Sequence, residues 1–219
     1  MSKPQSLIIL LVPSIFMLML MQCFSCPAYQ KQSLLQFKSS VFSIFNSSNS
    51  SSETSFFGLE SWNFISDCCK WDGVVFSSRS RAITTLYLSS LLLMPTQDPM
   101  VPVLVDSRVL DPVFRIRSLM LLDVSSNGIQ GEISGKGLKN LTKLVHLDMR
   151  HNSFNGSIPA ELFHLRFLQF FDLSINSLEG GLSSEVGKLE NLRTLNLDGN
   201  LLGGSIPEHI VLEMNTTRN

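Results

Sequence analysis

Large apolar residues recur at fixed offsets along the second half of the chain, and each set is followed by an asparagine. The asparagines are separated by 25, 24 and 24 residues and are Asn127, Asn152, Asn176 and Asn200. Three apolar residues stand at the same distances before each of them, as Leu119, Leu122 and Val124 stand before Asn127. An apolar residue, a glycine and another apolar residue follow. A period of this length indicates a chain built from stacked structural repeats.

Each fixed position in the repeat has a physical explanation. An apolar residue at every second position predicts a short strand that turns these side chains inward. One such strand per repeat predicts a single parallel sheet. A buried Asn amide, with both donors and an acceptor, can pair the backbone groups left where the chain bends away from the strand. The glycine permits a tight turn. Because no repeat buries its apolar face alone, the pattern predicts an α/β solenoid, and this spacing is the leucine-rich-repeat signature.

A helix is predicted in front of the repeats. From Gln30 to Phe45, apolar residues recur every three or four positions, which is typical of one helical face. This helix would cover the open end of the first repeat. We therefore expect an N-terminal cap at residues 26–78, a first atypical repeat at 79–118, four repeats at 119–212 and a polar tail at 213–219.

The atypical repeat departs from the pattern in two ways. Leu91 stands where the other repeats have asparagine, and the next strand begins later than the period requires. The extra residues fall within the segment from Pro95 to Pro112, which also contains Pro99 and Pro102. We predict an irregular loop there, as a surface insertion rather than a functional island.

The first 25 residues have the features of a secretory signal peptide. The apolar stretch from Leu7 to Met21 is about 15 residues long, which is short for a membrane span of about 20. We expect cleavage after Ser25, with an uncleaved signal anchor as the alternative. Export implies an oxidising compartment and agrees with five N-glycosylation sequons, at Asn46, Asn49, Asn140, Asn155 and Asn215.

Cysteine count and charge exclude several functions. Cleavage after Ser25 leaves Cys26, Cys68 and Cys69, and three cysteines cannot all pair within one chain. Adjacent cysteines with no histidine nearby argue against a zinc site, so we expect no metal and no cofactor. The net charge of −1 and the absence of a long charge run argue against a nucleic-acid partner.

The cap carries a more specific signal. It contains Cys26, then Gln32-Ser33-Leu34-Leu35-Gln36-Phe37-Lys38, Trp62 and Asp67-Cys68-Cys69-Lys70-Trp71-Asp72-Gly73-Val74. With repeats ending in Gly-Ser-Ile-Pro, this string resembles the cap of plant leucine-rich-repeat receptor-like proteins and receptor kinases. The extended spacing before Asp123 is particularly similar to the receptor-like proteins, which lack a kinase.

The resemblance implies a right-handed superhelix with a parallel concave sheet and a helical cap. It implies a module at the cell surface or in the apoplast that binds a peptide, protein or glycan ligand and acts through a co-receptor kinase in defence or developmental signalling. It also implies a disulfide between Cys26 and Cys68. Cys69 then lacks its usual mate, because Phe76 stands in the fourth cysteine's place. Cys69 is free, or pairs with Cys23 after earlier cleavage, or pairs with another chain.

Length is the second departure from these relatives, which usually carry many more repeats, a membrane span and a short tail. We expect a truncated member, with membrane association only if a missing C-terminal span exists. Two alternatives stay open, a small secreted inhibitor or scaffold and an inactive relic.

Candidate ligand contacts are predicted on the exposed face of the sheet. Equivalent residues of adjacent strands lie about 4.8 Å apart there and form columns. One column, Asp123, Asp148, Asp172 and Asn196, recurs in nearly every repeat, so we expect its carboxylates to be solvated or bonded to polar neighbours. The varying columns are more informative, because solenoid stability does not dictate them. The candidates are His146, Asp148, Arg150, Gln169, Phe170, Arg193 and Asp198.

Two of these candidates carry specific hypotheses. Phe170, flanked by Arg150 and Gln169, has the aromatic and arginine character of binding hot spots. His146 lies near Asp148, so protonation near the ordinary histidine pKa of about 6.5 could tune binding. The other histidines occupy different repeat positions, and no Ser/His/Asp or metal-ligand set converges, so we predict a non-enzymatic protein.

Overall fold

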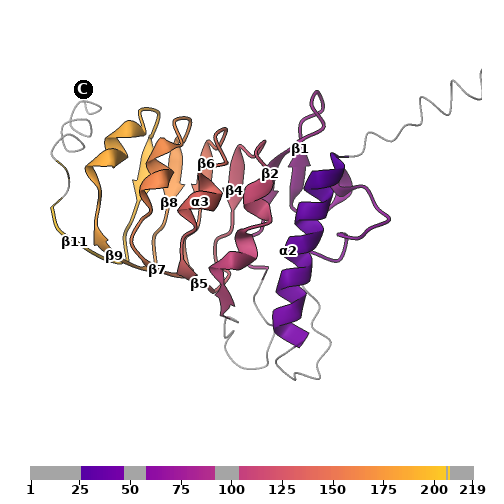
Figure 1. The fold of residues 1–219 in the computed structure, drawn as a ribbon, viewed down its shortest axis with the longest axis horizontal. Coiled ribbons are helices and arrows are strands. Elements are labelled where there is room, and N and C mark those ends of the chain that lie inside the picture. The colour runs from indigo at the N-terminus through magenta and orange to yellow at the C-terminus, as the bar shows by residue number, and fades with distance from the viewer. Residues whose placement is uncertain (1–25, 47–57, 92–103, 206, 208–219) are drawn as a thin grey trace, which may run out of the picture.

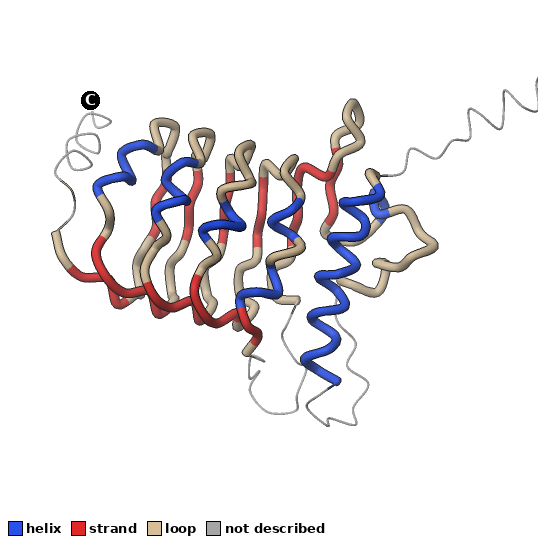
Figure 2. Tube along the Cα trace, viewed as in Figure 1, coloured by secondary structure: helices blue, strands red, loops and turns tan. Residues whose placement is uncertain are grey.

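The computed structural model is a row of stacked coils with a long helix at one end (Figure 1). It describes residues 26–46, 58–91, 104–205 and 207. The predicted signal peptide, the sequons at Asn49 and Asn215, and the polar tail lie outside the described residues. In each coil, the chain passes through a strand of one sheet, a strand of a second sheet and a short helix, which line different sides of the solenoid (Figure 2).

The first sheet contains the predicted repeat strands in the order of the sequence. Their middle residues, such as Leu122, Leu147 and Phe171, are buried in the core. The first pair is antiparallel and the other pairs are parallel. The strands are β1 (Val74–Phe76), β2 (Ile83–Tyr87), β4 (Leu121–Asp123), β6 (His146–Asp148), β8 (Phe170–Asp172) and β10 (Thr194–Asn196).

A second parallel sheet follows the asparagines, where the repeat pattern predicted only a turn. Its strands are rich in Ser, Asn and Gly, which are depleted in strands, so local propensity did not reveal them. The glycine of the repeat takes the left-handed conformation, with φ of 98° at Gly131 and 71° at Gly156. The strands are β3 (Val105–Asp106), β5 (Ile129–Glu132), β7 (Ser153–Gly156), β9 (Ser177–Gly181) and β11 (Leu201–Gly203).

Short helices complete the coils on the convex side. Each contributes buried side chains that face the first sheet across the core, such as Leu138, Phe163 and Val186. The helices are η2 (Ser107–Leu110), η3 (Val113–Arg115), α3 (Gly135–Leu138), η4 (Ala160–His164) and η5 (Ser184–Lys188).

The asparagines form the expected ladder along the inside of the bend. The Nδ2 of Asn152 donates to the carbonyl oxygens of Val124 and Met149, each at 3.0 Å. Its Oδ1 accepts from the backbone N–H groups of Asn127 at 3.2 Å and Ile129 at 3.0 Å. The same pattern continues at Asn176 and Asn200. Each amide therefore joins its own repeat to the preceding one.

The irregular loop predicted between Pro95 and Pro112 is wrong for its described part. Residues 92–103 lie outside the described part, but residues 105–112 belong to ordinary repeat elements. Val105 pairs in parallel with Ile129 in the second sheet, and Val109 and Leu110 are buried. The apolar residues of this segment were sufficient to fill the core of the first repeat despite the prolines around them.

The predicted cap helix is present as α2 (Ala28–Asn46). Leu34, Phe37 and Val41 pack into the core. The buried Gln30 links the helix to the repeats, because its Oε1 accepts from Ile83 N at 2.7 Å and its Nε2 donates to Ser118 Oγ at 2.8 Å. These polar contacts tie the helix to β2 and to the segment just before β4.

The rest of the cap is organised around η1 (Cys68–Lys70) and a pair of stacked indoles. Trp62 and Trp71 lie 5.4 Å apart between ring centroids. Cys26 and Cys68 form a disulfide, the pairing that the family resemblance implies. Among the described residues Cys69 is a free cysteine, and burial, reinforced by Asp67, raises its pKa to about 11. Its thiol is therefore protonated at neutral pH.

Candidate concave binding surface

The first sheet brings two of the predicted contacts into direct stacking. Its register places Leu121 beside His146, His146 beside Phe170 and Phe170 beside Thr194. The rings of His146 and Phe170 are 4.1 Å apart between centroids, with 4° between their planes. Since both side chains point away from the core, they form a flat aromatic surface across two adjacent repeats.

Apolar side chains extend this surface toward the cap. The register continues from Leu121 through Thr85 to Val75, and Val75 is exposed. Tyr87 in the neighbouring column and Met120 just before β4 are also exposed. We call Val75, Leu121, His146 and Phe170 the concave stripe. The sequence analysis missed Val75, Tyr87 and Met120, although extending the column alignment into the atypical repeat would have located Tyr87.

The aspartates beside the concave stripe are less exposed than predicted. Asp148 and Asp172 are only 5% and 4% exposed, so the expectation that Asp148 lies open to a ligand is wrong. Each accepts a hydrogen bond from the backbone two residues later, Asp148 from Arg150 N at 3.1 Å and Asp172 from Ser174 N at 2.8 Å. The alternative expectation, bonding to polar neighbours, is correct, because these carboxylates hold the bend that follows each strand.

Asp148 also orients a candidate contact. Its Oδ2 lies 3.5 Å from Arg150 Nε, and the arginine side chain is half exposed. Burial raises the pKa of Asp148, an effect that hydrogen bonding to Arg150 opposes. Asp148 is therefore a positioning residue for Arg150 on this surface.

His146 titrates below its ordinary range. Burial lowers its pKa, and the nearby carboxylates of Asp148 and Asp123 oppose that shift only in part. The neutral imidazole is therefore the form that stacks on Phe170 at neutral pH. A charge change at this position requires a more acidic medium than the ordinary value of about 6.5.

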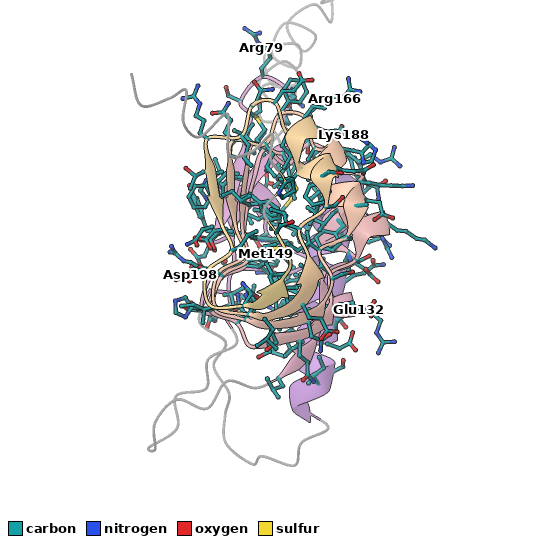
Figure 3. All side chains as sticks on the ribbon, turned by 90° about the vertical axis from the view of Figure 1, so that its left-hand side faces the viewer. Arg79, Glu132, Met149, Arg166, Lys188 and Asp198 are labelled. Carbon is teal, nitrogen blue, oxygen red and sulfur yellow. A yellow bond between two sulfur atoms is a disulfide. The ribbon has the colours of Figure 1, made fainter. Side chains whose placement is uncertain are left out.

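The remaining predicted contacts surround the concave stripe without converging on one point. Arg193 and Asp198 are exposed, whereas Gln169 is half-buried. Arg193 N donates to Gln169 O at 2.8 Å, which keeps these two residues adjacent. Asp198 projects from the outer side of the first sheet (Figure 3). It lies two residues after the end of β10, and Arg150 and Ser174 occupy the same place after β6 and β8.

No metal site is indicated among the described residues. Cys26, Asp67 and Cys68 have ligand atoms within 4.8 Å of one another. Both sulfurs are consumed by the disulfide, so this set offers no thiolate. The described sequon asparagines lie away from the concave stripe. Asn155 is exposed on β7 and Asn140 is half-buried after α3, while Asn46 is the last residue of α2.

Family models match both parts of this architecture. The model described as "Leucine rich repeat N-terminal domain" matches residues 27–75, and "Leucine Rich Repeat" matches residues 143–165 and 191–211. Receptor-like protein 46 of Arabidopsis thaliana is 46% identical over 142 residues, 65% of this chain. The chain therefore contains a leucine-rich-repeat N-terminal domain and leucine-rich repeats in these segments. It is similar to the plant receptor-like proteins, as the cap motif indicated.

Solved structures agree with this assignment. A plant ice-binding protein superposes with a TM-score of 0.69 at 26% identity, covering 84% of this leucine-rich-repeat chain and 52% of the other. A chain of the BIR3–SERK2 complex from Arabidopsis thaliana gives 0.59 at 32% identity, covering 70% and 78%. The Arabidopsis receptor kinase HAESA ectodomain, in complex with an IDA peptide hormone ligand, gives 0.60 at 28% identity, covering 82% and 27%. The predicted solenoid with a parallel sheet and a helical cap is confirmed.

The match to Receptor-like protein 46 covers 16% of that relative, so this leucine-rich-repeat chain spans a small part of its length. In the described part, α2 and the other helices are too short or too polar to cross a membrane.

Proposed function

We propose that the chain is an extracellular recognition segment of a receptor-like protein and that the concave stripe contacts a peptide or protein ligand. The observation that carries the proposal is the His146–Phe170 stack on the outer face of the first sheet, where both side chains are half-buried and which solenoid stability does not require. Other repeats have leucine or threonine at the equivalent position. An aromatic pair of this kind offers a large apolar contact area with few rotamers to restrain.

The groups around the stack give the surface its selectivity. Arg150 is held by Asp148, and Arg193 and Asp198 add one charge of each sign nearby. An extended peptide that crosses the strands would place apolar side chains on the stack and polar groups toward these charges. The peptide complex of HAESA, which has a similar fold, supports this mode of recognition. In this proposal the chain is non-catalytic and acts through a co-receptor kinase.

A displayed library of random peptides tests the proposal. The secreted chain is used to select peptides, and the affinities of the selected peptides are measured against Phe170→Ala. We expect the affinity to fall roughly thirtyfold, because truncation of a hot-spot residue costs about 2 kcal/mol. Phe167→Ala is the matched control, since Phe167 is an exposed phenylalanine outside the stripe. Equal affinities for Phe170→Ala and the unmodified chain, with both proteins folded, would contradict the proposal.

A further inference from the structure

The charged residues of the repeats are segregated between two opposite edges of the first sheet. Four loops lead into strands β4, β6, β8 and β10, at residues 115–118, 139–143, 164–167 and 188–191. Glu190 is their one acidic residue. They contain six Lys or Arg residues, Arg115, Arg117, Lys139, Lys143, Arg166 and Lys188. We call this set the basic edge.

The edge where the strands end has the opposite charge. Its four segments, residues 123–132, 148–156, 172–181 and 196–204, contain six Asp or Glu residues and one Arg. Asp148 and Asp172 among them are buried and hydrogen-bonded within the chain. Although the net charge is −1, positive and negative side chains are unevenly distributed between the two edges. The basic edge exposes more of its charged groups to solvent than the acidic edge does.

The basic edge is a continuous surface. Hydrogen bonds connect neighbouring coils at this edge, from Val145 N to Met120 O at 2.7 Å just after the loops and from Asn191 Nδ2 to Arg166 O at 2.7 Å within them. Arg166 and Lys188 lie together toward one end of the coil section, whereas Glu132 and Asp198 lie toward the other (Figure 3). The cations are therefore repeated along the solenoid at the spacing of its strands, about 4.8 Å.

These cations are available to a partner when Asn140 carries no glycan. All six are exposed. Lys188 forms an ion pair with Glu185, and Arg115 donates to Gln36 Oε1. Lys139, Lys143, Arg117 and Arg166 form no ion pair with another described residue. Acidic residues in the described part of the chain therefore do not cancel the positive electrostatic potential of the basic edge.

Two further features of the basic edge favour a saccharide over a peptide or a membrane. Phe167 is 59% exposed and sits between Arg166 and the start of the next strand, where it offers a flat apolar face to a sugar ring. A hollow of about 440 Å³ is lined by Lys139, Asn140, Glu161 and His164. Guanidinium groups bind carboxylates in a bidentate geometry, and the amide and imidazole can hydrogen-bond hydroxyl groups.

We propose that the basic edge binds a linear acidic polysaccharide that carries a carboxylate on each sugar. Successive repeats present cations to successive carboxylates, and Phe167 packs against a ring. This site lies on a different side of the molecule from the concave stripe, so its success or failure is independent of the proposed peptide recognition.

The test measures binding of an oligogalacturonate to the secreted chain by calorimetry. Its methyl-esterified form, which has the same rings without the charge, is the ligand control. Every protein carries Thr142→Ala, because the sequon at Asn140 lies within the basic edge and a glycan there would cover it. The test variant is Lys143→Ala/Arg166→Ala. Its matched control, Lys70→Ala/Arg108→Ala, removes the same charge from the exposed Lys70 of the cap and the exposed Arg108 of η2.

We expect the acidic oligomer to bind and the esterified oligomer not to bind. Affinity should fall about tenfold in the test variant, remain within about twofold in the control, and weaken as salt is added. Equal binding of both oligomers, or equal loss in both variants, would overturn the proposal. Binding to vesicles of anionic lipid without binding to the oligomer would overturn it in favour of a membrane contact. Salt-sensitive self-association without oligomer binding would overturn it in favour of pairing between copies through their opposite edges.

Discussion

A single asparagine controls the junction between two repeats. The Asn152 amide satisfies backbone groups of its own repeat and of the preceding one, and these groups are partly buried inside the bend. We predict that Asn152→Ala lowers the free energy of unfolding by about 2–4 kcal/mol, because it leaves several partly buried groups without partners. Urea denaturation measures the change. The exposed Asn155→Ala should stay within about 0.5 kcal/mol, and comparable losses in both variants would contradict this role for the ladder.

The stacked histidine predicts a pH dependence of stability with a definite sign. Burial depresses the pKa of His146 in the folded state, so the unfolded chain binds the proton more readily. The stability linked to His146 is therefore complete above the unfolded value of about 6.5 and is lost as pH falls from there toward the depressed folded pKa. Denaturation of His146→Gln at several pH values should show a shallower decline in that window. Parallel curves for both proteins would exclude this linkage.

Gln30 decides how a whole element, the cap helix α2, is attached. Its amide bonds connect the helix to Ile83 of β2 and to Ser118 before β4. We predict that Gln30→Ala loosens β1 and β2 without unfolding the later repeats, since each coil of a solenoid contacts mainly its neighbours. Faster amide hydrogen exchange in residues 74–87, with little change in residues 146–172, would show this. The exposed Gln32→Ala on the same helix should leave exchange unchanged, and uniform acceleration across all strands would refute the local effect.

The burial of successive strands predicts that the protection of backbone amides from hydrogen exchange varies along the molecule. The middle residues of β4, β6 and β8 are fully buried, whereas Leu195 in β10 is only half-buried. Amide exchange in the described chain should therefore be slowest in β6 and faster in β10, by about tenfold for each 1.4 kcal/mol difference in opening free energy. Mass spectrometry of exchanged peptides measures the gradient. Identical protection in the two strands would indicate one cooperative unit instead.

Much of the fold could be predicted because the repeat imposes the same constraint several times. The positions of Leu122, Leu147 and Phe171 define the first sheet, and the alternation of a strand assigns the residues between them to the outer face. The cap motif supported the disulfide partner of Cys26. The boundaries assigned to the cap and the repeats stay predictions, as do the ligand contacts.

Other features depend on contacts between repeats and could not be predicted. The second sheet is formed by residues with weak strand propensity, and its strands exist because adjacent coils bring their backbones into register. The burial of Asp148 depends on the turn that its own carboxylate closes. Alternation alone assigned this side chain to solvent.

By itself, the sequence determined a capped leucine-rich-repeat solenoid, its Asn ladder and the column that contains His146 and Phe170. These follow from periodicity, which a chain carries locally in each repeat. Only the tertiary structure decided that the two rings stack, that Asp148 is enclosed while Arg150 is exposed, and that the loop cations converge on one edge. Those properties arise when the coils stack on one another, because stacking brings residues some 24 positions apart to within the spacing of adjacent strands, about 4.8 Å.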